Sequence, residues 1–377
     1  MTVAVQMQMR VPFLDLKSQF QSIDAEVHDA IRAVLDSCQY VAGPWVEKFE
    51  EKFSQFVGAR YTVAVGSGTA ALELALRAAG IEPGDEVIVP ANSFFATAEA
   101  VSTIHATPVF VDVDPSTFHI DDSLLESVLT PKTRAIIPVH LYGRASDLTA
   151  IERFAAKHHL QIIEDACQAV GTARDGVPVG GSGRLTCFSF YPGKNLGAYG
   201  DGGAITTNDA DQARTLRVLR DHGSPAKYEH VVVGTNSRLD AIQAAVLSVK
   251  LQYLSAWNAQ RVRHATALAE GLHGLDICAP VIPPAGEHNF HLFVVRTAQR
   301  EALRAFLKSR NIDTGIHYPT PLHLTAAYQS LGYPAHGAFP VSESLAGEIL
   351  SLPMYAELTD EQVAYLVAAL SDFSERN

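Results

Sequence analysis

A lysine surrounded by glycines is the residue of this sequence with the clearest chemical potential. Lys194 lies between Gly193 and Asn195 in the stretch SFYPGKNLGAYGDGGA (189–204), where little side-chain bulk surrounds it. A lysine removed from water has a lowered pKa, and its neutral amine attacks aldehydes. The stretch is not a P-loop, because Phe188 stands where a glycine is needed and no Ser or Thr follows the lysine. It therefore predicts an amine nucleophile, with an exposed loop lysine as the alternative.

A second chemical feature is a carboxylate at the end of an apolar strand. In the stretch IIEDACQA (162–169), Asp165 closes the strand and Gln168 follows three residues later. A carboxylate at that position can pair with a pyridinium nitrogen and keep it protonated, so that the ring accepts electrons. Gln168 can then donate to a phenolic oxygen of the same ring. The competing interpretation is an aspartate that caps the following helix.

The third feature is a glycine-rich turn from a strand into a helix. In VGSGTAAL (65–72), Gly68 permits close backbone approach, and Ser67, Thr69 and the helix N-terminus offer donors to a phosphate. The turn partly matches a dinucleotide-binding pattern, which also needs an acid at the end of the second strand. That strand ends in VPANSFF (89–95) and has no acid. We therefore interpret the turn as a phosphate site, with a simple helix cap as the alternative.

These features require strands that end close together. Short apolar runs alternate with helical stretches at 69–79, 94–104 and 147–159, which is typical of a mostly parallel sheet with helices on both faces. Ligands of such sheets bind beyond the carboxyl ends of the strands, where all three features fall. The predicted strands span residues 61–65, 86–90, 108–113, 134–139, 160–165, 186–191 and 203–207.

The remaining segments predict a second, smaller domain. Helical spacing precedes the first strand, at 17–36 and 44–56, and a long helix is expected over 238–270. We place the domain boundary inside that helix, which gives a large domain over 1–250 and a small C-terminal α/β domain over 251–377. The small domain is expected to contain a strand at 291–296 and helices near 300–310, 341–350 and 359–373.

The composition limits the function classes. The chain has 377 residues and a formal net charge of −12, which argues against a nucleic-acid surface. No apolar run is long enough to cross a bilayer and the first residues lack a secretory signal, so we expect a cytoplasmic protein without membrane contact. The four cysteines are scattered and lack zinc-ligand spacing, so we expect reduced core thiols and no metal site.

The chain order of phosphate turn, aspartate and lysine loop is that of fold-type I enzymes, which use pyridoxal phosphate (PLP). Over essentially its whole length, the chain also resembles the DegT/DnrJ/EryC1/StrS sugar aminotransferases. The matching stretches are VPFLDL (11–16), SGTAAL (67–72), GDEVIVP (84–90), PVHLYG (138–143), EDACQA (164–169), SFYPGKNLG (189–197), GDGGA (200–204), GTNSRLD (234–240) and HYPTPLH (317–323).

The resemblance implies which residues bind the cofactor. Lys194 would hold PLP covalently and move the proton, and Asp165 would pair with the pyridinium. Gln168 would bind the ring hydroxyl, and Phe94 would stack on the ring. The phosphate would be bound by Gly68, Thr69, Ala70 and Ser189. The resemblance also implies a homodimer with shared active sites, in which Asn236 of the other subunit would reach the same phosphate.

The resemblance also implies a sugar site. Its residues would be Tyr191, Lys227, Arg238, His317 and Tyr318, and Tyr191 and His317 are candidate catalytic residues as well. A core tyrosine, a solvated lysine, a surface ion pair and a turn histidine are the alternative interpretations of four of them. The role of His140 is left open, because a histidine at the end of a strand can serve the fold alone.

The implied reaction moves an amino group from L-glutamate to C3 of a dTDP-linked 3-keto-6-deoxyhexose, with the cofactor alternating between PLP and its amine form, PMP. The alternatives are a 4-keto sugar aminotransferase of the perosamine type and a non-catalytic regulator with the same fold. A regulator should carry a DNA-binding module or a basic face, and the acidic chain shows neither. An amino-acid aminotransferase needs a pair of arginines for two carboxylates, and the sequence does not place such a pair.

Overall fold

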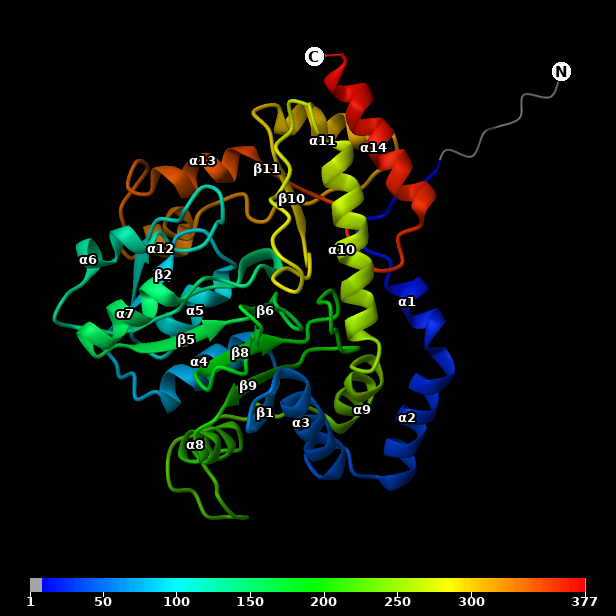
Figure 1. The fold of residues 1–377 in the computed structure, drawn as a ribbon. Coiled ribbons are helices and arrows are strands. Elements are labelled where there is room, and N and C mark those ends of the chain that lie inside the picture. Colours follow the sequence, from blue (N-terminus) through cyan, green and yellow to red (C-terminus); the bar gives the residue numbers. More distant parts are fainter. Residues whose placement is uncertain (1–8, 377) are drawn as a thin grey trace.

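The computed structural model describes residues 9–376 and contains a sheet of seven strands with helices on both faces (Figure 1). The strands are β1 (Tyr61–Val65), β2 (Glu86–Pro90), β3 (Thr107–Val111), β4 (Thr133–Ile136), β5 (Gln161–Asp165), β6 (Ala173–Arg174), β7 (Val177–Pro178), β8 (Leu185–Ser189), β9 (Gly203–Thr207), β10 (Phe293–Arg296) and β11 (Ile349–Leu352). The order in the main sheet is β1-β9-β8-β5-β4-β2-β3, and β9 runs antiparallel to both neighbours. The predicted α/β fold with a mostly parallel sheet is confirmed.

Helices cover both faces because alternate residues of each strand are buried on opposite sides. In β2, Val87 and Val89 pack with α4, α5 and α8, whereas Ile88 packs with α6 and α7. At the other end of the sheet, α3 and α9 cover Ala64 of β1. The helices are α1 (Leu16–Ser22), α2 (Asp24–Ser37), α3 (Pro44–Val57), α4 (Gly68–Ala78), α5 (Phe95–Thr103), α6 (Leu125–Val128), α7 (Thr149–His158), α8 (Ala210–Arg220), α9 (Ala241–Lys250), α10 (Leu254–Gly271), α11 (Arg300–Ser309), α12 (Ala326–Gln329), α13 (Pro340–Glu348) and α14 (Asp360–Ser374), with short 3₁₀ turns η1 (Asp122–Leu124), η2 (Leu141–Gly143) and η3 (Leu322–Leu324).

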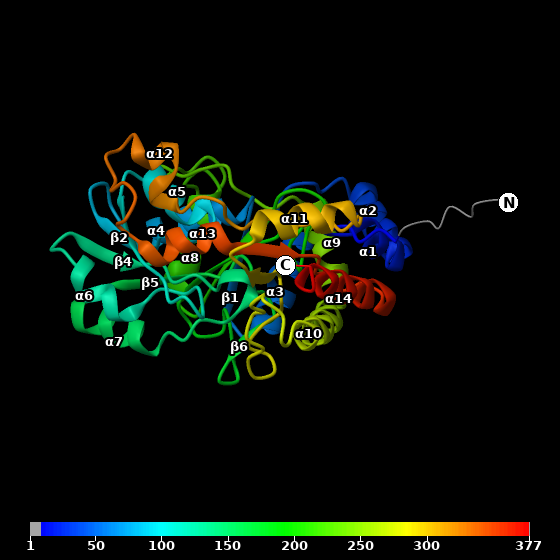
Figure 2. The same ribbon diagram turned by 90° about the horizontal axis from the view of Figure 1, so that it is seen from above.

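The C-terminal part forms a second core beside the sheet. Helices α10, α11 and α14 pack around the antiparallel pair β10–β11, on the side of the molecule opposite α6 and α7 (Figure 2). Val11, near the start of the described chain, belongs to this core, and its N–H donates to the Asn311 carbonyl at 3.0 Å. The N-terminal segment therefore packs with the C-terminal part, and the domain division at residue 250 stays a prediction.

Several predicted elements differ from the structure. The helix expected over 238–270 is two helices, because the chain turns at 251–253 between α9 and α10. The helix expected to reach residue 350 ends at Glu348, since the apolar run that follows pairs with β10 as β11. Helix α8 was not predicted, and its buried face consists of Ala213, Leu216 and Leu219.

The cysteines and the helices bear on two further expectations, that of core thiols and that of a chain without a membrane span. All four cysteines are free, but Cys38 and Cys278 are exposed, so the expectation of core thiols is wrong for these two. Cys187 is buried in the sheet. None of the helices within residues 9–376 is both long and apolar enough to cross a bilayer.

A buried network fixes the end of β5, the strand that carries Asp165. The Nε2 atom of His140 lies 2.9 Å from a Glu164 carboxylate oxygen, and its Nδ1 atom accepts the Ser146 N–H at 2.9 Å. The other Glu164 oxygen accepts from Arg184 Nε at 2.6 Å. Because both ring nitrogens bond to the protein, His140 supports the strand end, which answers the question that its sequence position left open.

Burial on its own would raise the pKa of Glu164, but the hydrogen bonds and charges of His140 and Arg184 outweigh burial and lower the pKa to about 2. A lowered pKa in the folded state stabilises the fold above the unfolded-state pKa of 4.5. This contribution is lost as the pH falls from that value toward about 2.

We expect Glu164→Gln to lower the free energy of unfolding by about 3 kcal/mol at neutral pH, because the buried carboxylate that bonds to both His140 and Arg184 is lost and Arg184 keeps Glu152 alone. Denaturant unfolding measures the change, and the gap to the wild type should shrink as the pH falls below 4.5. The matched control is Glu152→Gln, which removes the more exposed partner of the same arginine and should cost less than about 1 kcal/mol. Equal costs for both variants would contradict a special role of the buried carboxylate.

Candidate active site

A cavity of about 610 Å³ opens at the carboxyl ends of β5 and β8 and is lined by both the sheet and the C-terminal part. It brings together residues as far apart in the chain as Phe13 and Met354, as expected for the strand-end site of an open α/β sheet. Ten of the fourteen predicted site residues line it: Gly68, Thr69, Phe94, Asp165, Gln168, Ser189, Tyr191, Lys194, His317 and Tyr318.

Lys194 stands in the turn that follows β8. Its backbone N–H donates to the Tyr191 carbonyl at 2.8 Å, which closes the turn and directs the side chain into the cavity wall. Burial lowers the pKa of the Lys194 ammonium below its ordinary value, while the nearby Cys167 and Asp165 act in the opposite direction. The lowered pKa increases the fraction of neutral amine, which is the nucleophilic form.

The Asp165 carboxylate is buried at the end of β5 with both oxygens held. One oxygen accepts from Thr97 Oγ1 at 2.8 Å, and the other accepts the Cys167 N–H at 3.1 Å. Ser93 Oγ lies 2.7 Å from Thr97 Oγ1 and extends the network. These bonds fix the carboxylate so that it faces the cavity in one orientation.

The start of α4 forms a cup beside Lys194. As the first residues of the helix, Gly68 and Thr69 have backbone N–H groups without intrahelical acceptors, and both residues line the cavity. A Cβ atom on Gly68 would lie 2.6 Å from Ser189 Cβ and 3.0 Å from Cys167 Sγ, so no other residue fits without a shift. The N–H of Ala70 donates to Ser67 Oγ at 3.1 Å, and Ala70 does not line the cavity.

The opposite wall carries amide, phenol and imidazole groups. Gln168 Nε2 donates to Tyr318 Oη at 3.1 Å, and its Oε1 accepts the Tyr142 N–H at 2.6 Å. His317 stacks on Phe13 with ring centroids 5.6 Å apart, and its Nδ1 lies 2.8 Å from Ser351 Oγ. Burial and then the Lys194 charge lower the pKa of His317 to about 4, so its ring is neutral at pH 7.

Two aromatic side chains that line the cavity are exposed. Phe94 is 51% exposed and its ring centroid lies 5.6 Å from that of Tyr318. Tyr191 is 59% exposed on the cavity edge. Both rings are therefore accessible to a ligand, as the predicted roles of ring stacking and sugar contact require.

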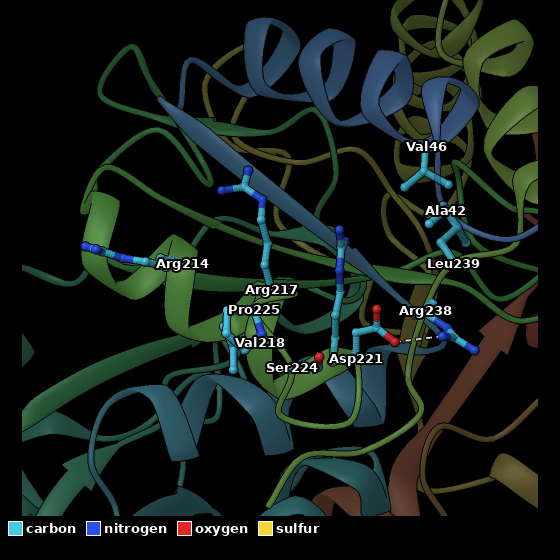
Figure 3. A pocket seen from close by; sticks show the side chains of 11 residues that line it. Ala42, Val46, Arg214, Arg217, Val218, Asp221, Ser224, Pro225, Arg238 and Leu239 are labelled. Atoms are coloured by element: carbon cyan, nitrogen blue, oxygen red, sulfur yellow. Dashed lines mark hydrogen bonds and ion pairs between the residues drawn. The ribbon is translucent and has the colours of Figure 1, made fainter. Parts of the chain in front are cut away.

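Four predicted residues do not line this cavity in the single chain: Ala70, and three residues that follow α8 in the sequence. Lys227 and Asn236 are exposed in the segment 221–240, which follows α8. Arg238 lies in a separate pocket of about 420 Å³, where it pairs with Asp221 at 2.6 Å (Figure 3). The roles predicted for Lys227, Asn236 and Arg238 remain predictions. That of Asn236 was expected in the second subunit.

Sequence reasoning missed several cavity residues. Arg261 of α10 and His291 line the cavity, and Thr97 of α5 binds the Asp165 carboxylate. Arg261 gave no signal, because a charged residue in an amphipathic helix predicts a solvated face. Only the packing of α10 against the lysine loop reveals it. No cluster of metal-ligating side chains is present within the described residues.

Comparisons with known proteins agree with this geometry. The family model of the DegT/DnrJ/EryC1/StrS aminotransferases matches residues 21–371. The chain belongs to this family. It is 46% identical over 368 residues to a dTDP-3-amino-3,4,6-trideoxy-alpha-D-glucose transaminase of Streptomyces venezuelae, covering 97% of each chain. It is also 46% identical over 368 residues to a "pleiotropic regulatory protein" of Geobacillus stearothermophilus, covering 97% of this chain and 99% of that one.

Solved structures are equally similar. DesV of S. venezuelae, crystallised with a ketimine intermediate, superposes with a TM-score of 0.96 at 46% identity and covers 98% of this chain and 99% of its own. NtdA of Bacillus subtilis with bound PMP has a TM-score of 0.90 at 33% identity and covers 97% of this chain and 85% of its own. The resemblance found in the sequence is confirmed, and with it the expected PLP/PMP cofactor of an aminotransferase.

The residues present fit that cofactor. The cup at Gly68, which a Cβ atom would fill, suits the phosphate, and the helix N-terminus favours its negative charge. The buried Asp165 carboxylate suits a protonated ring nitrogen, and the amine of Lys194 suits an aldehyde.

We expect Gly68→Ala to weaken PLP binding by about 10-fold or more, because the new methyl group displaces Ser189 and disturbs donors to a charged phosphate. Fluorescence or absorbance titration of the apo protein with PLP measures the change. Gly347→Ala is the matched control, since a Cβ atom there meets nothing within 4 Å. Unchanged PLP affinity in Gly68→Ala would place the phosphate elsewhere.

Proposed function

We propose that this aminotransferase moves the amino group of L-glutamate to C3 of a dTDP-linked 3-keto-6-deoxyhexose. The observation that carries the proposal is the cavity in which Lys194, Asp165 and the α4 cup converge beside a wall of aromatic and polar side chains. When bound, PLP supplies an electron sink that stabilises negative charge on the carbon bearing the amino group. The residues of the chain bind and orient the cofactor and the substrates, and they transfer the proton.

Lys194 is proposed as the residue that moves the proton. Its partly buried amine has a lowered pKa, so it gives up a proton more readily than an ordinary lysine and can take one up again. The tight turn closed by its own N–H limits the positions that the amine can reach. Proton removal and return by one group suit a transamination, in which the same proton leaves one carbon and reaches another.

Asp165 and Gln168 are proposed to orient the cofactor ring. The two hydrogen bonds to Asp165 hold its carboxylate in one orientation in the cavity wall, where it can pair with a protonated ring nitrogen. Gln168 is held by the Tyr142 N–H and by Tyr318, so its amide is fixed before a ligand binds. Preorganised groups of this kind need no rearrangement during the reaction.

The sugar is proposed to occupy the wall formed by Tyr191, His317 and Tyr318. These side chains offer hydrogen-bonding groups beside the apolar Phe13 and Leu14, a mixture that suits a deoxy sugar. The neutral imidazole of His317 can accept or donate a hydrogen bond without adding charge. The choice of C3 and of dTDP follows the name of the S. venezuelae relative, a dTDP-3-amino-3,4,6-trideoxy-alpha-D-glucose transaminase, and amination of a 4-keto sugar is the alternative.

A regulator without enzymatic activity is the second candidate, because one relative carries a regulatory name. The two candidates differ in what Lys194 must do. A regulator has no use for a partly buried lysine with a lowered pKa facing a buried carboxylate, and the net charge of −12 disfavours DNA contact. Conversion of bound PLP to PMP by glutamate separates them.

A homodimer with shared active sites is proposed from the segment 221–240. Its tip exposes Tyr228 (84%), Val231 (58%), Val232 (49%) and Val233 (85%), an apolar group that a partner chain would cover. The segment also makes contacts of its own, since the Val231 N–H donates to the Gly223 carbonyl at 2.9 Å. Lys227 and Arg238 would then serve the sugar nucleotide, and Asn236 the phosphate, of the neighbouring subunit.

We expect borohydride treatment of the purified enzyme to fix a pyridoxyl group on the peptide that contains Lys194, as read by mass spectrometry. Addition of glutamate should convert the visible absorbance of bound PLP to that of PMP, and a dTDP-3-keto sugar should restore it. Lys194→Ala should lose both steps while retaining PLP in the α4 cup. Label on another lysine, or no response to glutamate, would overturn the enzymatic proposal.

Shared sites predict complementation between two inactive variants. A mixed dimer of Lys194→Ala and Asn236→Asp chains contains one intact site, so random reassociation should restore activity to about a quarter of the sites. Turnover after mixing, with mass spectrometry to count mixed dimers, measures the recovery. Mixed dimers that form without any recovery would show that each chain builds its site alone.

A further inference from the structure

Arg261 is a buried cation in the wall of the reaction cavity. It is 3% exposed and projects from α10 into the space that Lys194 also lines. Its Nη1 atom donates to the carbonyls of Phe290 at 3.2 Å and Met354 at 2.8 Å. No residue between 9 and 376 accepts from its other guanidinium nitrogens, and it makes no ion pair with a described carboxylate.

Burial without an ionic partner is unfavourable for a guanidinium group. It lowers the pKa of Arg261 to about 10, and the charge of Glu357 opposes that effect from a distance. The side chain remains a cation at pH 7 nonetheless. A protein keeps such a charge in a cavity wall at a cost in stability, which an anionic ligand can offset.

The position of Arg261 is tied to that of Lys194. Asn258 lies one helical turn before Arg261 on α10 and accepts a hydrogen bond from Asn195 at 2.8 Å, next to Lys194. His291, which bonds to Asn195 at 3.1 Å, has its pKa lowered by burial and then by the charges of Lys194 and Arg261. Both cations therefore act on the same part of the cavity.

Other basic groups of the cavity do not compete for an anion. The lowered pKa values of His291 and His317 leave both rings neutral at pH 7. Lys194 is engaged in the reaction itself. Arg261 is thus the permanent cation that the described chain offers to a carboxylate in this cavity.

Resting on the proposed use of an amino acid as donor, we propose that Arg261 binds the α-carboxylate of that donor. The guanidinium presents parallel N–H groups that match a carboxylate, and it lies on the lysine side of the cavity, where the α-carbon must react. Arg261 is thereby the anchor of the α-carboxylate. The side-chain carboxylate of the donor does not require a second buried arginine. A donor that lacks the α-carboxylate should be a poor substrate.

The test separates the two half-reactions. In Arg261→Gln, kcat/KM for the conversion of PLP to PMP by L-glutamate should fall about 100-fold or more. The return half-reaction of PMP-loaded enzyme with the keto sugar should change little, because that substrate has no α-carboxylate. Arg263→Gln is the matched control on the same helix, since Arg263 is exposed and pairs with Asp360 at the surface.

Ligand changes identify the carboxylate. Isoglutamine lacks the α-carboxylate and glutamine lacks the side-chain carboxylate, so Arg261→Gln should lose the discrimination against isoglutamine and keep that against glutamine. Calorimetry with glutarate, an unreactive dicarboxylate, should show weaker binding to the variant. If Arg261→Gln does not fold, Arg261→Lys, which retains the charge, should show the same selective loss to a smaller degree.

Equal damage to both half-reactions would overturn the proposal and leave Arg261 as a residue that ties the 290 and 354 loops. An unaffected glutamate half-reaction would also overturn it, while the aminotransferase function would stand. Loss of discrimination against glutamine instead of isoglutamine would assign Arg261 to the side-chain carboxylate. A wild-type enzyme without any glutamate reaction would refute the proposed function itself.

Discussion

The burial of the Asp165 carboxylate at the end of β5 is the constraint on which the active site depends. A buried charge is stable only when hydrogen bonds replace water, and here Thr97 and the Cys167 N–H do so. The strand end itself is held because the His140 N–H donates to the Asp165 carbonyl at 3.0 Å. The same carboxylate counteracts the effect of burial on Lys194, so the chemistry of the lysine and the stability of the strand end are linked.

The lysine loop is attached to two helices at once. Lys250 of α9 is buried and donates to the Gly197 carbonyl at 2.7 Å, and Asn258 of α10 accepts from Asn195 at 2.8 Å. A Cβ atom on Gly197 would lie 2.2 Å from the Pro192 carbonyl oxygen, so the loop closes on itself without side-chain bulk. The turn between α9 and α10 therefore lets one stretch of chain brace the loop from two directions.

Net charge and local charge differ in this molecule. The chain carries −12 overall, yet the cavity wall presents Lys194 and Arg261, and the segment 221–240 presents Lys227 and Arg238. A substrate with a diphosphate and a donor with two carboxylates both need cations at defined points. A negative net charge disfavours polyanions and does not prevent small anions from binding beside individual cations in a cavity wall.

The sequence determined the sheet, the order of its motifs and the strand-end positions of most predicted cofactor-binding residues, because these depend on local properties. Apolar runs such as EVIVP form strands wherever they are covered on both faces, and Gly68, Asp165 and Lys194 follow strands at their carboxyl ends. Strand β11 was not foreseen, since its four apolar residues extend a helical pattern until β10 pairs with them. The position of Arg261 in the cavity wall and the role of His140 were decided by tertiary structure alone. Charge and position in the chain do not reveal whether a side chain faces water or a cavity, and only the packing of α10 and β5 against distant segments settles that.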